Sequence, residues 1–309
     1  MTISPLLKSG HVWLGIILAM CDAFAGTLIS IYAYSIFLSS YPTEWLIYYV
    51  VSQAIFTSFL RMVGLSLLSK DIKKSALVQY AIFIVLFIIC IILMSFYRYY
   101  YVPFAVAVLC SGVVALCSIL VWSLLSLSYE MREYKSVAMY ANQAAFISSI
   151  ISSFLVPVMM MFFTNQSLII ASTIMAIGSV IVIALLPVKN PPEVLEKSKH
   201  QSPKTVKYPL FRYMMIFAII SSTAGGISQY LLRFEAGHYY SHEELSSFLG
   251  YFSGITNILG LLVASTSTIV IKRFGLSALL YSVPIATFLS SLLTFFSPVF
   301  RNVILLGGV

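Results

Sequence analysis

The sequence predicts an all-α fold, a polytopic bundle of transmembrane helices. Of the 309 residues, 60% are hydrophobic and only 9% are charged, with a mean hydropathy of +0.98. A soluble domain carries about 25% charged residues. Apolar runs recur along the chain at about 20 residues each, the length that a helix needs to cross a bilayer. Backbone groups in lipid must be satisfied within their own segment, so we expect these runs to be helices.

We expect about nine complete spans and the first turns of a tenth. A basic, proline-rich segment over residues 188–209 separates six of the spans from the rest. The expected spans run approximately over Val12–Leu38, Trp45–Leu68, Ala76–Phe96, Phe104–Leu127, Val137–Phe163, Leu168–Leu186, Leu210–Leu232, Glu244–Ile271 and Leu276–Phe296, with Val303–Val309 beginning a tenth that is cut short.

The first four spans differ in character. The first contains Asp22 and continues through Ile36, which favours a retained span over a cleavable signal peptide. The second contains Arg61 and ends at a basic loop. The third is nearly pure Ile, Leu and Phe, which suits a helix facing lipid, and it ends in the tyrosine-rich stretch 97–101, typical of the headgroup level. The fourth leads into a charged loop over residues 129–135.

The fifth to eighth expected spans are distinguished by small residues and by a helix-capping pattern. The fifth is rich in Ala and Ser over residues 144–153, which permits close helix contact. The sixth returns to the polar segment. The seventh contains Ser221 to Gly226 at its centre, where a discontinuous helix would break. Ser241 and Glu244 have the spacing of a capping box and should start the eighth helix, and Arg233 to Glu244 is the expected loop before it.

The domain organisation follows from the polar segment. Four prolines and five lysines over 188–209 favour a solvated linker, although an ordinary cytoplasmic loop would have the same composition. We therefore expect a six-helix N-terminal half over residues 1–187, a cytoplasmic linker over 188–209 and an incomplete C-terminal half over 210–309. Each half places a basic loop about 60 residues after its first span begins, which is compatible with parallel repeats.

The net charge of +8 is distributed asymmetrically. Fourteen Lys and Arg residues fall on one side of the expected topology, against Arg98, Arg233 and Arg301 on the other. This positive-inside pattern places the N-terminus and the central loop in the cytoplasm, in a cell or inner membrane. It explains the basicity without a nucleic-acid partner. The four cysteines all fall within expected spans, which argues against a disulfide framework.

Two stretches resemble a known family. They are VWSLLSLSYEMREYK over 121–135 and SHEELSSFLGYFSGITNIL over 241–259. Together with six spans before a central cytoplasmic loop, they resemble the major facilitator superfamily, and in particular the bacterial ATP:ADP antiporter or nucleotide transporter branch. The resemblance implies a secondary transporter of twelve helices with a nucleotide substrate. A nucleotide carries three or four negative charges, and Arg61 is the one deep cation that the expected spans contain.

Asp22 and Arg61 are the two charges well inside expected spans. Both lie about 13 to 15 Å from the cytoplasmic face at 1.5 Å per residue, so we expect them to lie at a similar depth and to be able to meet. Intramembrane charges are costly, which favours a functional pair: Asp22 would bind a coupling proton and Arg61 an anionic substrate group. The alternative is a permanent ion pair that joins two helices.

Uncharged polar residues complete the candidate site. They would bind substrate, or would instead bond neighbouring helices, and they are Gln53, Asn142, Gln143, Gln229 and Asn257. Gly225 and Gly226 are candidate hinge residues, although close packing would explain them equally well. His238, His242, Glu243 and Glu244 lack zinc-site spacing, so we expect no metal.

The predicted function is that of a secondary active transporter that moves a small, anionic or nucleotide-like solute by alternating access. No catalytic motif is visible, so we expect neither an enzyme nor a cofactor. Lipid and the solute are the expected partners, with proton coupling or exchange as the energy source. The alternative is a truncated, non-transporting relative or a membrane scaffold.

Overall fold

The computed structural model describes residues 10–67, 72–94, 96, 99–129, 131–187, 226, 229–240, 244–266 and 273. The expected linker, the ninth span and the start of the tenth lie outside these residues. The described elements are α1 (Gly10–Ser40), the 3-10 turn η2 (Thr43–Trp45), α2 (Leu46–Leu67), α3 (Ile72–Met94), α4 (Val102–Ser128), α5 (Met131–Phe162) and α6 (Gln166–Leu185), followed by helices over residues 229–239 and 244–266.

The described fold is all-α, and the first six expected spans are all confirmed as helices. Six helices are long and apolar enough to cross a membrane: α1, α3, α4, α5, α6 and the helix Glu244–Thr266. The chain is therefore a multi-pass membrane protein in character. The helix α2 has 22 residues, also the length of a span, but is not among those six.

Two boundaries differ from expectation. The helix α5 begins at Met131, inside the expected loop 129–135, because charged side chains are tolerated in the first turn of a helix once it leaves the lipid. The expected loop over Arg233–Glu244 is wrong in its first part, because the helix over 229–239 continues through Arg233 and Gly237. The charged residues there mark the edge of the apolar run, not the end of the helix.

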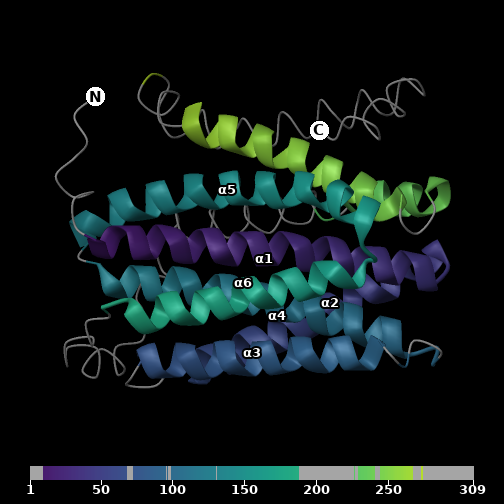
Figure 1. Ribbon diagram of the computed structural model, residues 1–309, viewed down its shortest axis with the longest axis horizontal. Helices are drawn as coiled ribbons and strands as arrows, with labels where there is room; N and C mark the ends of the chain where they lie inside the picture. The colour runs from purple at the N-terminus through teal and green to yellow at the C-terminus, as the bar shows by residue number, and fades with distance from the viewer. Residues whose placement is uncertain are drawn as a thin grey trace, which may run out of the picture. The chain divides into compact units, whose positions relative to one another are not determined.

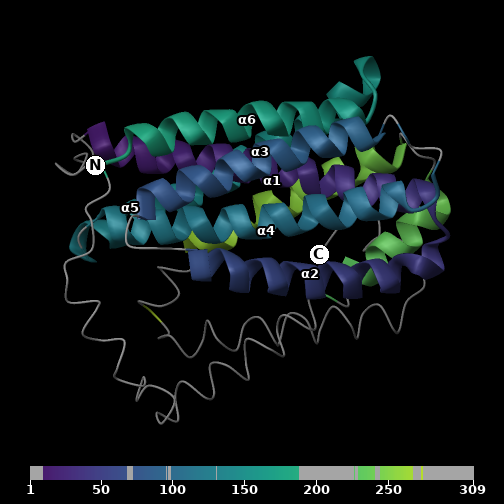
Figure 2. The same ribbon diagram turned by 90° about the horizontal axis from the view of Figure 1, so that it is seen from below.

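The chain divides into two compact units. One comprises residues 1–190 and 237–262, and the other comprises 191–236 and 263–309. In the first unit, α1 packs against α4, α5 and α6, so it is the central helix of the bundle. Figure 1 shows α1 between α5 and α6, and Figure 2, from below, shows α2 alongside α4.

The principal contacts among the six helices form a symmetric set. They are α1 with α4, α5 and α6, α4 with α2 and α3, and α3 with α6. Exchanging α1, α2 and α3 with α4, α5 and α6 converts this set into itself. Consecutive helices that are separated by only a few residues alternate in direction, so α1 and α4 are antiparallel. This contact pattern is the one expected of an inverted repeat of two helix triplets.

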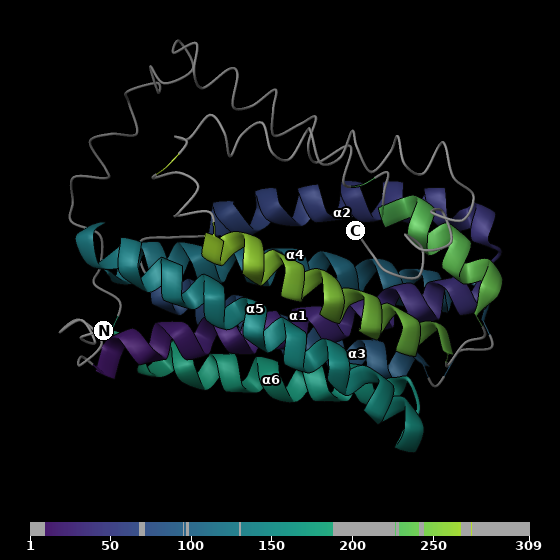
Figure 3. The same cartoon turned by 90° about the horizontal axis from the view of Figure 1, so that it is seen from above.

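The helix Glu244–Thr266 packs along α5, as Figures 1 and 3 show. Glycines make this approach close. A Cβ atom on Gly250 would lie 2.9 Å from the backbone oxygen of Ser153, and one on Gly254 would lie 2.8 Å from the ring of Phe154. These two glycines form a G-x-x-x-G pattern, which allows two membrane helices to approach closely.

The end of the bundle that contains Ser40 and Asn165, here called the Asn165 end, is packed with aromatic rings. Phe37 stacks on Tyr49 with a centroid distance of 4.6 Å and on Tyr41 at 5.2 Å. The Tyr49 hydroxyl is 2.6 Å from the Ser111 hydroxyl. These contacts join α1, α2 and α4, so this end of the bundle is held by side-chain packing.

The opposite end, here called the Lys73 end, is held by a lysine. The Lys73 Nζ atom donates hydrogen bonds to the backbone oxygens of Ala184 at 2.7 Å and Leu186 at 2.9 Å. Carbonyl groups at a helix C-terminus have no partner within the helix and carry partial negative charge. Lys73 on α3 therefore caps the end of α6.

Candidate functional site

Asp22 and Tyr80 form a polar contact inside the bundle. Asp22 lies on α1, twelve residues beyond its first residue (22 minus 10), which places it about 18 Å along the helix. Tyr80 lies on α3, is only 1% exposed, and donates a hydrogen bond from Oη to Oδ1 of Asp22 at 3.2 Å. The long tyrosine side chain brings a neutral donor to a carboxyl group near the middle of the central helix.

The surroundings of this pair are weakly polar. Cys21 precedes Asp22 on α1, and Cys117 on α4 is close enough to Asp22 and Tyr80 to interact electrostatically with both. All four cysteines are free thiols, and Cys90 contacts Cys110 between α3 and α4. Asp22 is thus surrounded by hydroxyl and thiol groups, which interact with a carboxyl group without neutralising its charge.

The exposure of α1 changes along its length. Every residue from Met20 to Thr27 is partly exposed, whereas every residue from Ile31 to Leu38 is buried. The partly exposed stretch includes Asp22. The buried stretch lies between Asp22 and the Asn165 end. Asp22 thus lies on a partly exposed stretch that is bounded by buried residues on both sides, by Leu18 and Ala19 toward the Lys73 end and by 31–38 toward the Asn165 end.

Arg61 does not join this site. It is exposed on α2, and the described residues contain no ion pair between it and Asp22. The reason is the packing of α2 on α4 instead of along α1. The two charges have a similar depth, but depth alone does not fix the direction in which a helical side chain points. The permanent ion pair that the sequence allowed is thus not formed in the described part of the bundle.

The other candidate residues have no hydrogen bond to Asp22 in the described part of the chain. Asn142 is exposed on α5, Gln143 is half-buried there, and Gln229 is exposed in the helix over 229–239. The Asn257 amide donates to Ser253 Oγ at 3.5 Å on its own helix. No hydrogen bond within the described ranges links any of these four to Asp22, and their role as substrate ligands stays a prediction.

Gln53, Gly226 and Gly225 also stay untested as functional residues. Gln53 accepts a hydrogen bond from the Tyr34 hydroxyl at 3.0 Å, which joins α2 to α1. Gly226 is exposed, with open space where a Cβ atom would lie. Gly225 lies outside the described residues.

A second polar cluster, which the sequence does not reveal, lies at the Asn165 end. Asn165 Nδ2 donates to Ser35 Oγ at 3.3 Å, Ser246 Oγ donates to Asn165 Oδ1 at 2.8 Å, and the two serine Oγ atoms are 2.5 Å apart. We call these three residues the Asn165 junction. They come from α1, the residue before α6 and the first turn of the helix Glu244–Thr266. No motif or spacing relates Ser35 to Ser246, which are 211 residues apart.

One more contact supports this end of the bundle. His238 Nε2 lies 3.1 Å from the Thr43 hydroxyl on η2, and a Cβ atom on Gly237 would lie 2.7 Å from the Thr43 methyl group. His238 is thus engaged in helix packing. The described residues contain no group of three or more His, Cys, Asp or Glu side chains suited to a metal ion.

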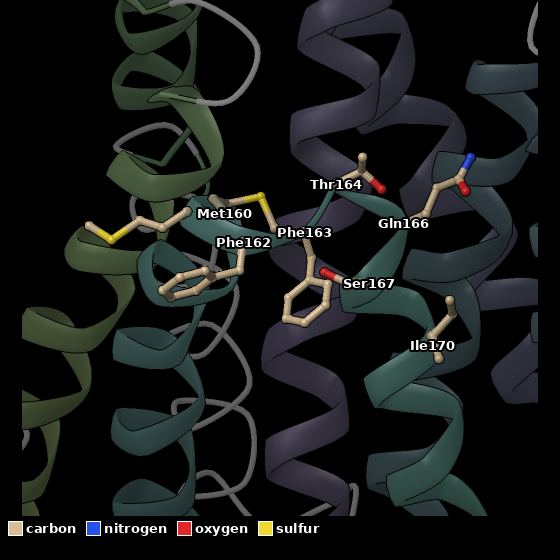
Figure 4. A pocket seen from close by; sticks show the side chains of 8 residues that line it. Met160, Phe162, Phe163, Thr164, Gln166, Ser167 and Ile170 are labelled. Atoms are coloured by element: carbon tan, nitrogen blue, oxygen red, sulfur yellow. The ribbon is translucent and has the colours of Figure 1, made fainter.

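The turn between α5 and α6 forms an open depression of about 580 Å³ (Figure 4). Its lining includes Phe162, which is 76% exposed, and Met161, which is 74% exposed, together with Thr164 and Gln166. The lining contains no charged residue. Such an open, mainly apolar surface suits the boundary of a bilayer better than the enclosed pocket that a small solute requires.

Comparison of the chain with protein-family models and with curated proteins gives no match. We therefore infer the function from the arrangement of the helices and from Asp22.

Proposed function

We propose that the protein is a secondary active transporter of the major facilitator type, which moves a small solute by alternating access. The observation that carries this proposal is the Asp22 carboxyl near the middle of α1, which accepts a hydrogen bond from the neutral Tyr80 hydroxyl. Ionisable groups inside a membrane bundle are costly, and they commonly mark ion or proton pathways. Asp22 is the proposed site at which a coupling proton binds and leaves.

The arrangement of the helices supports this proposal. The inverted repeat of two helix triplets is the arrangement within each half of a major facilitator transporter. The resemblance of residues 121–135 and 241–259 to the nucleotide transporter branch points in the same direction. The proposed orientation places the Lys73 end in the cytoplasm and the Asn165 end outside, because basic residues flank the cytoplasmic ends of spans.

The solute is proposed to be small and anionic or nucleotide-like, as the resemblance suggests. Arg61 is the cation proposed to attract it. In the described residues Arg61 and Asp22 are not paired, so one charge is free to act on the solute while the other exchanges a proton. The two roles would be separable by mutation.

The test is uptake of labelled solutes, with ATP and ADP in the first set, by liposomes that contain the purified protein. A pH gradient is imposed, and the wild type is compared with Asp22→Asn, Arg61→Ala and the control Glu44→Gln. Glu44 is an exposed acid on η2, outside the spans. Thermal unfolding of each variant establishes that it is folded.

Saturable uptake that is lost in Asp22→Asn and kept in Glu44→Gln would support the proposal. Loss in Arg61→Ala only for anionic solutes would support the assigned role of Arg61. If folded wild-type protein moves no solute and no protons, the transport proposal fails, and a membrane scaffold becomes the better description.

A further inference from the structure

The Asn165 junction joins parts of the chain that are far apart in sequence. Ser35 and Ser246 are each 0% exposed, and Asn165 bridges them from the turn before α6. The junction therefore connects the first six helices to the beginning of the helix Glu244–Thr266, and it does so at one end of the bundle only.

The bonds of the junction are suited to reversible opening. All three side chains are uncharged, so water can replace each hydrogen bond without leaving a bare charge behind. Hydrogen bonds between membrane helices are individually weak. While the junction is closed, Ser35 and Ser246 are buried and Asn165 is half-buried.

The remainder of the helix Glu244–Thr266 is attached to the bundle differently. From Ser247 to Leu261, the described residues contain no side-chain hydrogen bond from this helix to α5. Close contact there is made at Gly250, Gly254 and Gly260. The Tyr251 ring lies against Phe154. Ser153 on α5 is buried, and its Oγ atom has no hydrogen-bond partner in the described part of the interface. The helix can therefore tilt on its glycine surface when the junction breaks, because no other polar contact along this stretch resists the movement.

The burial of α1 between Asp22 and the junction describes the closed state. The partly exposed stretch over 20–27 contains Asp22, and the buried stretch over 31–38, which includes Ser35, separates Asp22 from the Asn165 end. A closed junction thus coincides with a carboxyl group that is sealed on the same side.

We propose that Ser35, Asn165 and Ser246 form the outer gate of the transport pathway, and that the structure shows the gate closed. This proposal rests on the proposed transport function. Opening breaks the three hydrogen bonds, tilts the beginning of the helix Glu244–Thr266 away from α1 and α6, and gives Asp22 access to the outside. Thr43 and His238 support the closed gate beside the junction.

The native thiol of Cys21 provides the measurement, because it precedes Asp22 and is the only cysteine of the four that is not fully buried. A membrane-impermeant maleimide is added to the outside of sealed vesicles, and the rate of labelling at Cys21 is read by peptide mass spectrometry. Asn165→Ala and Ser246→Ala should each raise this rate about threefold to tenfold, the change expected when weak hydrogen bonds of the closed state are lost.

Ser39→Ala is the matched control. The Ser39 hydroxyl lies at the same end of α1 and bonds only the backbone oxygen of Ile36 on its own helix. Removing it should leave the labelling rate unchanged. The gate proposal fails if Asn165→Ala and Ser246→Ala label at the same rate as Ser39→Ala.

A cross-link tests the closed state directly. In Ser35→Cys/Ser246→Cys, oxidation by copper phenanthroline and oxygen should remove one proton and one electron from each thiol and form a disulfide, since the native Oγ atoms are 2.5 Å apart. Ser35→Cys alone should form none. The disulfide should slow outside labelling of Cys21 and stop uptake, and reduction should restore both.

The outcomes separate this proposal from the transport proposal. Labelling requires no solute, so a gate that opens and closes in a protein that moves no solute would overturn transport and keep the conformational change. Undiminished uptake with the disulfide formed would overturn the gate and keep transport. Failure of the double variant to cross-link, in folded protein, would contradict the junction itself.

Discussion

The Tyr80 hydroxyl reaches across from α3 to bond the Asp22 carboxyl on α1 at 3.2 Å. Asp22 is the one acidic residue deep inside the described bundle, and its hydrogen-bond donor is therefore an uncharged group. A bond to a cation would fix the charge on Asp22, whereas a bond to a hydroxyl leaves the carboxyl group able to gain or lose a proton. Tyr80 also fixes the direction of the carboxyl group, because a ring that is 1% exposed has little freedom to move.

Asp22→Asn should abolish uptake driven by a pH gradient and should keep solute exchange across the membrane. The amide imitates the protonated carboxyl group in shape, but it cannot release a proton. The measurement compares gradient-driven accumulation with exchange in the same liposomes. Equal loss of both activities in a folded variant would show that Asp22 acts on the solute and not on the proton.

Tyr80→Phe should reduce gradient-driven uptake without abolishing it, because the carboxyl group remains but loses the donor that positions it. Tyr48→Phe is the control, since Tyr48 is exposed on α2. The measurement is the ratio of gradient-driven accumulation to solute exchange, because a purely structural role of Tyr80 would lower both activities by the same factor. An unchanged ratio and rate in Tyr80→Phe would remove Tyr80 from the mechanism.

The helices were predictable from the sequence because a bilayer imposes their length and composition. The expected first span, Val12 to Leu38, corresponds to α1 over Gly10–Ser40. The partners of individual side chains were not predictable. Residue counts predict similar depths for Asp22 and Arg61. The direction in which each side chain points depends on the rotation of its helix about the helix axis, and this rotation is set by packing against neighbours such as α4. Ser35 and Ser246 were missed because single serines in spans carry no signal that identifies their partners.

Gly250→Ala should destabilise the protein by about 1 to 3 kcal/mol, the usual penalty for overpacking a close contact. The added Cβ atom would lie 2.9 Å from a backbone oxygen of α5 and 3.0 Å from the Val156 Cβ atom, and neither can rotate away. Gly254→Ala should cost less, because its Cβ atom meets the end of the Phe154 side chain, which is able to move.

Gly226→Ala is the matched control for these glycines, since nothing lies within 4 Å of the added Cβ atom. Thermal unfolding in detergent compares the three variants. If Gly250→Ala and Gly226→Ala unfold at the same temperature, the close packing of the helix Glu244–Thr266 on α5 is contradicted.

Lys73→Met should destabilise the protein by about 1 to 2 kcal/mol, because two carbonyl groups at the end of α6 lose a charged donor. Lys73→Arg should recover part of that loss. Lys74→Met removes the same charge from the adjacent position but keeps both bonds of Lys73. Denaturant unfolding measures the free energy of unfolding of the three variants. Equal destabilisation in Lys73→Met and Lys74→Met would indicate that net charge, and not the cap on α6, is responsible.

Tyr129, at the Lys73 end, should make the free energy of unfolding decrease as the pH rises into the alkaline range. Burial raises the pKa of Tyr129 above its ordinary value, a hydrogen bond with the Gly15 backbone offsets part of this rise, and nearby Glu133 adds a smaller rise. An unfolded tyrosine has a pKa of about 10. Below that pH the folded and unfolded forms both retain the proton, so the full stability is present.

Above about pH 10 the unfolded form loses its proton first, so stability falls as the pH rises toward the folded pKa. Tyr129→Phe should remove this part of the alkaline decline, whereas Tyr48→Phe, at an exposed position, should keep it. The measurement is the unfolding temperature between pH 8 and pH 11. The assignment fails if Tyr129→Phe and wild type lose stability in parallel, because Tyr129 would then titrate equally in both forms.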